Sequence, residues 1–326
     1  MQLTEKVLAG HQITLEEARF LMSLQGSDLY LLLAMANKIK EKFAGSKVDL
    51  CSVINARSGK CSEDCAFCAQ SIHHNTKINT HELLSEEEFL THAREIKKTG
   101  ANRFSIVTSG KGVDKDFSKI VKILKQLEKE TRLKICASLG ILDEKAVEEL
   151  KQANVSRYHH NLETAPSFFD KICTTHSYED RVKTVRLAKE AGMEVCCGGI
   201  IGLGETPEQR LELAFFLRDL DVDSVPINVL NPVPGTPLEK AKPLSPLEIL
   251  KTIAVFRFIL PDKILRYAGG REVNLRDLQA MGLVAGINGI LIGNYLTTYG
   301  RNPEDDIKMI KDLELTFERR MVYEQN

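Results

Sequence analysis

The chain has 326 residues, 43% of them hydrophobic, which is enough to build a sizeable core. Its 44 Lys and Arg residues balance 45 Asp and Glu residues, so the composition does not indicate nucleic acid or an acidic membrane surface as the main partner. No apolar run approaches the roughly 20 residues of a membrane span, and the N-terminal segment lacks a signal-peptide core. The sequence therefore predicts a cytoplasmic protein.

The predicted elements begin with an N-terminal helical extension, residues 1–45, and continue as alternating strands and helices through residues 46–326. Helical periodicity marks the extension at 15–22 and 28–43. Short β-branched runs predict strands at 48–55, 103–109, 133–139, 155–161, 193–200, 224–230, 263–270 and 286–293. Charged stretches of helical period predict helices at 85–100, 115–130, 143–153, 178–191, from 206, from 245 to about 259 and around 275–281.

Local signals support these boundaries and point to one fold class. Ser85 and Glu88 form a capping box, and Thr206 followed by Pro207 is a helix start. Repeated strand–helix units imply a parallel sheet, and eight of them in a chain of this length favour a closed (β/α)8 barrel of the TIM type. Active sites in such barrels lie at the carboxyl ends of the strands, so the loop after the first strand is expected on the catalytic face.

That loop, CSEDCAFC, carries Cys61, Cys65 and Cys68 of the eight cysteines in the chain. In a reducing compartment such clustered thiols indicate metal ligands or reactive groups rather than disulfides. Three thiolates can hold three irons of a [4Fe–4S] cluster and leave the fourth iron open for chemistry. A zinc site is the alternative, and it would need a fourth ligand such as His73 or His74.

The C-x3-C-x2-C spacing, with an aromatic residue before the last cysteine, resembles the radical S-adenosylmethionine (SAM) superfamily. The motifs NARSGKCSEDCAFCAQS, YHHNLET, CGGIIGLGET, VPINVL with VPGTPL, and AGGRE together resemble the biotin synthase family, from about residue 48 to the end of the chain. The resemblance implies that a [4Fe–4S] cluster binds SAM and that a 5′-deoxyadenosyl radical removes hydrogen atoms from dethiobiotin. Sulfur from an auxiliary iron–sulfur cluster would then close the ring.

The resemblance also implies roles for polar residues around the substrates. Asn161 and Asn228 match positions that contact dethiobiotin, and Glu163 matches the one that accepts hydrogen bonds from the SAM ribose. Arg181 matches the arginine that pairs with the SAM carboxylate. Arg103 matches a second arginine near the auxiliary cluster.

Ligands for the auxiliary cluster are expected on alternate strands, whose inward side chains share one layer of a barrel. By motif the resemblance supplies Cys136, Cys196 and Arg266, but Ser105 stands where the family usually has a third cysteine. A hydroxyl is a poor iron ligand beside a thiolate, so we hypothesise that Cys51 replaces it from the neighbouring strand. The auxiliary cluster is then either [2Fe–2S] or a larger, sulfur-rich variant.

Two cysteines receive no ligand role in this interpretation. Cys197 is expected to point away from Cys196 into the core and is a reserve ligand should Arg266 not bind iron. Cys173 follows the fourth strand and is read as packing.

The resemblance further implies several partners: a flavodoxin- or ferredoxin-type electron donor, the iron–sulfur assembly machinery and a second copy in a homodimer. The first alternative function is another radical SAM enzyme of the same subgroup, of the hydrogenase maturase or methylornithine synthase type. Such an enzyme would not need the cysteines of the third and fifth strands. The second alternative is a non-catalytic iron–sulfur or zinc regulator, which would bind metal without cleaving SAM.

Overall fold

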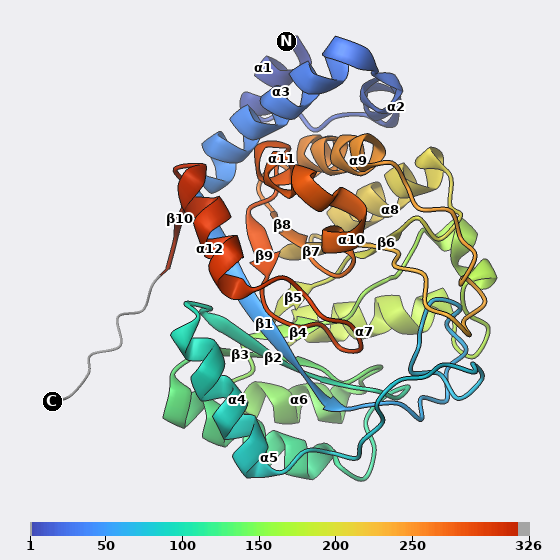
Figure 1. Cartoon of the computed structure of the whole chain (residues 1–326), viewed down its shortest axis with the longest axis vertical. Coiled ribbons are helices and arrows are strands. Elements are labelled where there is room, and N and C mark those ends of the chain that lie inside the picture. Colours follow the sequence, from blue (N-terminus) through green and yellow to red (C-terminus); the bar gives the residue numbers. More distant parts are fainter. Residues whose placement is uncertain (1, 319–326) are drawn as a thin grey trace, which may run out of the picture.

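The computed structural model describes residues 2–318, and its centre is a closed barrel of parallel strands (Figure 1). Strand β1 pairs with β2 on one side and with β9 on the other, which closes the barrel. The strands are β1 (Lys47–Arg57), β2 (Arg103–Thr108), β3 (Lys134–Ser138), β4 (Arg157–His159), β5 (Glu194–Cys196), β6 (Gly199–Ile201), β7 (Ser224–Val229), β8 (Ile264–Tyr267), β9 (Gly289–Leu291) and β10 (Thr316–Phe317). The predicted (β/α)8 barrel is confirmed.

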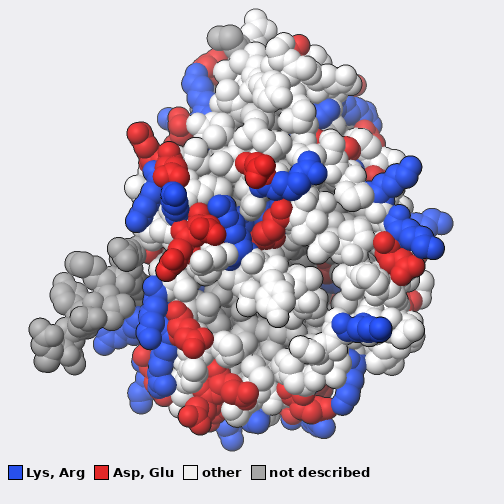
Figure 2. Space-filling view, viewed as in Figure 1, with Lys and Arg blue, Asp and Glu red and all other residues white. Residues whose placement is uncertain are grey.

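Helices surround this barrel. They are α4 (Glu86–Lys98), α5 (Phe117–Thr131), α6 (Glu144–Gln152), α7 (Tyr178–Glu190), α8 (Pro207–Asp219), α9 (Pro246–Ile259), α10 (Arg271–Leu275), α11 (Gln279–Val284) and α12 (Pro303–Asp312), with short 3₁₀ turns at Pro166–Lys171 and Arg276–Leu278. The capping box of Ser85 and Glu88 is present, and the Thr206 side chain caps α8 with Pro207 in its first turn. On the face shown in Figure 2, basic and acidic side chains are interspersed, in keeping with the balanced composition.

The fifth predicted strand differs from expectation, because it is broken into β5 and β6. Its neighbour β7 carries Pro226, which has no backbone N–H to donate to the ladder. The break falls at Cys197 and Gly198, and a Cβ on Gly198 would lie 2.1 Å from the Pro226 carbonyl oxygen. Glycine is therefore needed where these two chain segments approach.

The N-terminal helices lie together at one end of the molecule (Figure 1). They are α1 (Gln2–Leu8), α2 (Leu15–Ser23) and α3 (Gly26–Ala44), and α3 packs on α9 and α11 through an apolar face that includes Leu29, Leu33 and Ala36. The sequence did not predict α1, α12 or the short β10. None of the helices within residues 2–318 is both long and apolar enough to cross a membrane.

Candidate active site

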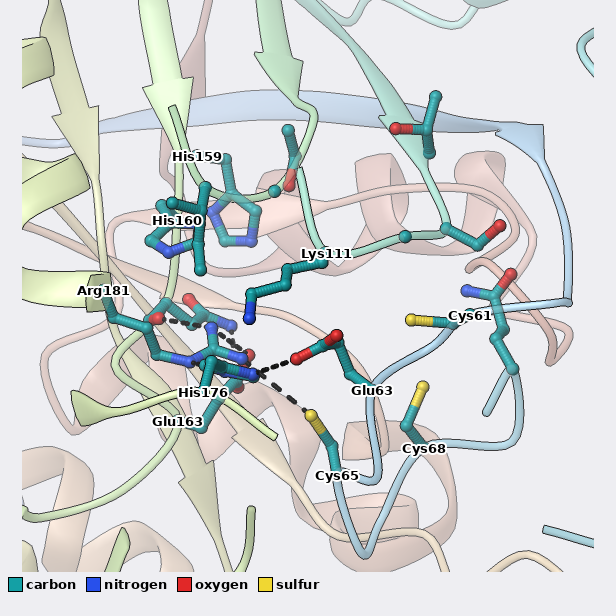
Figure 3. Close-up of a pocket in the computed structure, with 18 of the residues that line it drawn as sticks. Cys61, Glu63, Cys65, Cys68, Lys111, His159, His160, Glu163, His176 and Arg181 are labelled. Atoms are coloured by element: carbon teal, nitrogen blue, oxygen red, sulfur yellow. Dashed lines mark hydrogen bonds and ion pairs between the residues drawn. The ribbon is translucent and has the colours of Figure 1, made fainter. Parts of the chain in front are cut away.

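The cysteine loop follows β1 and borders a cavity of about 170 Å³ (Figure 3). Backbone hydrogen bonds shape the loop: the Cys61 N–H donates to the Gln70 carbonyl at 2.9 Å, and the Ala66 N–H donates to the Ile172 carbonyl at 2.8 Å. Cys61, Cys65 and Cys68 all line this cavity, as the fold prediction required.

The three sulfurs are spaced too widely for one metal ion. Two thiolates on a single zinc lie no more than about 4.6 Å apart, since each Zn–S bond is about 2.3 Å. Within residues 2–318, Cys61, Cys65 and Cys68 do not form a group with all sulfurs inside 4.8 Å of one another. His73 and His74 instead face the backbone carbonyls of Ser62 and Cys68, at 3.0 and 2.9 Å. The donor set suits a cluster of several irons better than the zinc alternative.

Arg181, on α7, forms the opposite wall of this cavity and is only 8% exposed. Its Nη1 donates to the Asn161 carbonyl at 2.9 Å and to Glu163 Oε1 at 3.3 Å, and its Nη2 lies 4.0 Å from the Cys65 sulfur. The structure thus brings Asn161, Glu163 and Arg181 together beside the cysteine loop.

The backbone at Glu163 is unusual for its residue type. Its φ of +69° lies in the left-handed region, which side chains other than Asn, Asp and Gly seldom adopt. Its backbone carbonyl accepts a hydrogen bond from the Ile200 N–H at 2.7 Å, which ties the turn after β4 to β6. Strained backbone of this kind concentrates at functional sites.

A second cavity of about 390 Å³ adjoins the first inside the barrel. Cys51, Cys136, Cys196 and Arg266 all line it, from β1, β3, β5 and β8 respectively. The two cavities share the wall residues Phe67, Cys68, Ser138, His159, Asn161 and Glu163, and Asn228 lines the second.

Ser105 also borders the second cavity, between Val53 of β1 and Cys136 of β3 in register. Cys197, by contrast, is fully buried in the core outside the barrel, as expected.

A cluster of charges lies beneath these thiols, at the amino ends of the strands. We call it the floor cluster; it consists of Asp49, Arg103, Arg157, Glu194 and Arg266. Asp49 pairs with Arg266 at 3.0 Å and with Arg103 at 3.2 Å. Burial would raise the pKa of the Asp49 carboxyl, but Arg266, and then Arg103, hold it well below its ordinary range.

The floor cluster fits an anionic group above it. Three guanidinium groups face two carboxylates there, which leaves one positive charge over. The Arg103 Nη1 is buried without a hydrogen-bond partner among the described residues. Buried donors are rarely left unpaired, so this atom indicates an acceptor such as a cluster sulfide. Three thiols with a surplus of positive charge are the chemistry that an iron–sulfur cluster requires.

His159 is a site residue that sequence reasoning did not single out. It lines both cavities, and its Nδ1 lies 3.1 Å from the Cys196 carbonyl oxygen. Burial would raise the pKa of the Cys196 thiol, but the neighbouring His159 imidazole lowers it to about 6. Its position in the sequence could have indicated this role, because His159 lies at the carboxyl end of β4, two residues before Asn161.

Comparison with known proteins agrees with this geometry. The Radical SAM superfamily profile matches residues 56–217, and the Biotin and Thiamin Synthesis associated domain matches residues 226–316. The biotin synthase of Carboxydothermus hydrogenoformans is 58% identical over 96% of this chain and 97% of its own length. That of Clostridium acetobutylicum is 57% identical over 97% of this chain and 98% of its own length.

This chain belongs to the biotin synthase family. As members of the radical SAM superfamily, biotin synthases carry a [4Fe–4S] cluster that binds SAM, and they also carry an auxiliary iron–sulfur cluster. Among solved structures, methylornithine synthase superposes with a TM-score of 0.85 at 23% identity, covering 97% of each chain. At that identity the likeness shows the shared barrel fold alone, so the alternative functions are not favoured over biotin synthase.

Proposed function

We propose that this chain is a biotin synthase that inserts sulfur into dethiobiotin. The observation that carries the proposal is the pair of adjoining cavities, one bordered by a three-cysteine loop and the other by three further cysteines. When bound, the SAM-carrying cluster supplies a 5′-deoxyadenosyl radical that removes hydrogen atoms, and the auxiliary cluster supplies the sulfur. The protein contributes binding, orientation and shielding from water.

In the first cavity, Cys61, Cys65 and Cys68 hold the [4Fe–4S] cluster, and Arg181 and Glu163 bind SAM. Arg181 is a buried guanidinium, so a carboxylate of SAM finds a charge-assisted partner there. Glu163 offers two carboxylate oxygens to the paired hydroxyls of a ribose. The ion pair between these two side chains, at 3.3 Å, holds both in position.

Asn161, in the wall shared by the two cavities, and Asn228, in the wall of the second, bind dethiobiotin. Each amide is fixed by local bonds: Asn161 Oδ1 accepts from the Gly198 N–H at 3.2 Å, and Asn228 Oδ1 accepts from the Gly269 N–H at 2.9 Å. Each Nδ2 makes one further bond, which leaves one N–H for a ligand. A ureido carbonyl, as in dethiobiotin, is a matching acceptor.

In the second cavity, Cys51, Cys136, Cys196 and Arg266 hold the auxiliary cluster, with Cys51 replacing the family cysteine at Ser105. Support comes from their common cavity and from the unpaired Arg103 donor beneath it. Either a [2Fe–2S] cluster or a larger, sulfur-rich cluster satisfies this donor set. The position of His159 beside Cys196 suits a role in orienting that ligand.

The proposal extends to partners and location. A flavodoxin- or ferredoxin-type protein delivers the electron, iron–sulfur assembly proteins load the clusters, and the enzyme works in the cytoplasm as a homodimer. The near-equal numbers of basic and acidic residues in the chain do not favour one of these partners over another.

The test is an anaerobic assay of the reconstituted protein with reductant, SAM and dethiobiotin. Mass spectrometry is expected to find both 5′-deoxyadenosine and biotin, and the C65A variant is expected to form neither. Deoxyadenosine without biotin would move the assignment to another radical SAM reaction, and metal binding without deoxyadenosine would move it to a regulator.

A further inference from the structure

A second thiol lies against one of the three cysteines of the loop. The Cys173 sulfur is 3.8 Å from the Cys65 sulfur, and both residues are buried, at 3% and 7% exposure. Their backbones are neighbours as well, because the Ala66 N–H donates to the Ile172 carbonyl at 2.8 Å. Two cysteines on adjacent backbone segments, with sulfurs nearly in contact, approach the geometry that a disulfide needs.

His176 and Asp64 contact the Cys173 sulfur, each at 3.3 Å, yet they do not make it a metal site. Together, Cys65, Cys173 and His176 place three ligand atoms within 4.8 Å of one another. The imidazole is already occupied, however: its Nε2 accepts from Arg181 Nε at 2.9 Å, and its Nδ1 faces Glu63 at 2.5 Å. This tautomer leaves a proton on Nδ1, which also lies 3.3 Å from the Cys173 sulfur, so no ring lone pair is left for a metal.

We propose that Cys173 is the disulfide partner of Cys65, and that the bond between them forms in the cluster-free protein on exposure to peroxide. The inference rests on the proposed function only for its consequence, which is that Cys65 cannot bind iron while it is oxidised. The bond itself depends on the placement of the two sulfurs alone.

The chemistry balances with one equivalent of hydrogen peroxide. Cys65 lines the first cavity, whereas Cys173 does not, so the oxidant meets Cys65 first. The Cys65 sulfur attacks one oxygen as its proton passes to the Cys173 sulfur, toward which Cys65 donates in the structure. The O–O bond breaks, and a sulfenic acid and hydroxide form. The Cys173 thiolate then attacks that sulfur and displaces a second hydroxide. The two thiols lose two electrons to the peroxide, and their two protons convert the hydroxides to water.

The disulfide would protect the cluster site. A sulfenic acid without a nearby thiol is oxidised further to sulfinic acid, which thiol reductants do not reverse. A disulfide is returned to two thiols by dithiothreitol, after which Cys65 can accept iron again. Of the three loop cysteines, Cys65 is the one whose sulfur contacts Cys173.

The test uses full-length protein stripped of iron without oxygen, treated with one equivalent of hydrogen peroxide and then alkylated. Trypsin releases residues 61–77, with all three loop cysteines, and residues 172–181, with Cys173 alone. Non-reducing mass spectrometry is expected to find these two peptides joined, with two hydrogens lost. The link should disappear in C65S and persist in C61S and C68S. Alkylated Cys173 in the treated wild type, or a link to Cys61 or Cys68, would overturn the proposal.

A second measurement tests protection. After two equivalents of peroxide and then dithiothreitol, Cys65 should return to a thiol in the wild type, whereas in C173A it should carry sulfinic acid, the second equivalent having oxidised the sulfenic acid. C197A removes a buried cysteine elsewhere and should behave as wild type. Equal recovery of C173A and wild type would contradict the protective role. A chain that makes no biotin yet forms this bond would refute the proposed function and leave the disulfide standing.

Discussion

At the scale of single residues, the site combines ligands with side chains that hold those ligands in place. Arg181 contacts Asn161, Glu163, His176 and Cys65, so one guanidinium organises most of the first cavity. In the second cavity, Asp49 has the same organising role for the arginines below the thiols. Substitutions of the ligands and of the organising residues should therefore give different signatures.

The assignment of Cys51 is tested by substitution with alanine. Cys51 lines the second cavity but not the first. C51A should therefore retain the iron of the SAM cluster and lose that of the auxiliary cluster. Iron and sulfide are counted after anaerobic reconstitution. S105A is the matched control on the adjacent strand and should keep both clusters. An unchanged auxiliary cluster in C51A would remove this residue from the ligand set.

The role of Glu163 is tested by E163Q, which keeps the shape of the side chain and removes its charge. Hydrogen bonds to a charged acceptor are roughly twice as strong as neutral ones, so SAM should bind about tenfold more weakly. Equilibrium dialysis of the reconstituted protein measures the affinity, and iron content checks that the cluster is intact. E179Q, on the exposed side of α7, should bind SAM as wild type does. Equal affinities in both variants would exclude the ribose contact.

At the scale of elements, the junction between α3 and the barrel contains a charge that opposes folding. Lys40 of α3 is 2% exposed, and its Nζ donates to the Leu283 carbonyl of α11 at 2.6 Å. Burial, and then repulsion by Arg257 of α9, lower the pKa of Lys40 to about 8. One hydrogen bond does not replace the hydration that the ammonium group loses.

The free energy of unfolding should therefore change with pH in the alkaline range. Between the folded pKa of about 8 and the unfolded pKa of about 10.4, the unfolded chain binds more protons, so wild-type stability rises with pH. At pH 7, K40M should be more stable by about 2 kcal/mol, since it avoids the burial cost and loses one hydrogen bond.

Urea unfolding of the cluster-free protein at pH 7 and pH 10 measures this effect, and the advantage of K40M should shrink at the higher pH. K38M removes an exposed lysine from the same helix, one that pairs with Glu5, and should change stability by less than about 0.5 kcal/mol. An advantage of K40M that stays constant with pH would show that lost charge is not its source.

At the scale of the whole molecule, the N-terminal extension presents apolar side chains that nothing in the described chain covers. Phe20 is 61% exposed, Tyr30 52% and Leu31 45%. Exposed apolar groups gathered on one end of a protein indicate a contact surface, and the proposed homodimer supplies a partner for it. The barrel would then be left with its mouth unobstructed.

Sedimentation at micromolar concentration tests this arrangement. The wild type should have twice the chain mass of 36.5 kDa, and a double variant, F20D with Y30D, should shift toward the single-chain mass because two charges would be buried at the contact. V273D, which changes an exposed residue of α10, is the control and should stay dimeric. A dimer that survives F20D with Y30D would place the contact elsewhere.

Much of this architecture could be predicted from the sequence, because the signals are local. Strands follow β-branched runs and helices follow capping residues, so the barrel and the placement of the cysteine loop needed no tertiary information. The break between β5 and β6 depends on Pro226 in a neighbouring strand, and α1 is too short to give a clear period. The roles of Asp49, His159 and Cys173 depend on contacts with residues far away in the sequence, and the residues next to them in the chain do not reveal those contacts.

The floor cluster also bears on which end of the barrel a substrate can use. The ion pairs of Asp49 with Arg103 and Arg266 lie across the barrel beneath the thiols, at the amino ends of the strands. On the proposed function, dethiobiotin and biotin would therefore pass through the opposite end of the barrel, where the cysteine loop borders the first cavity.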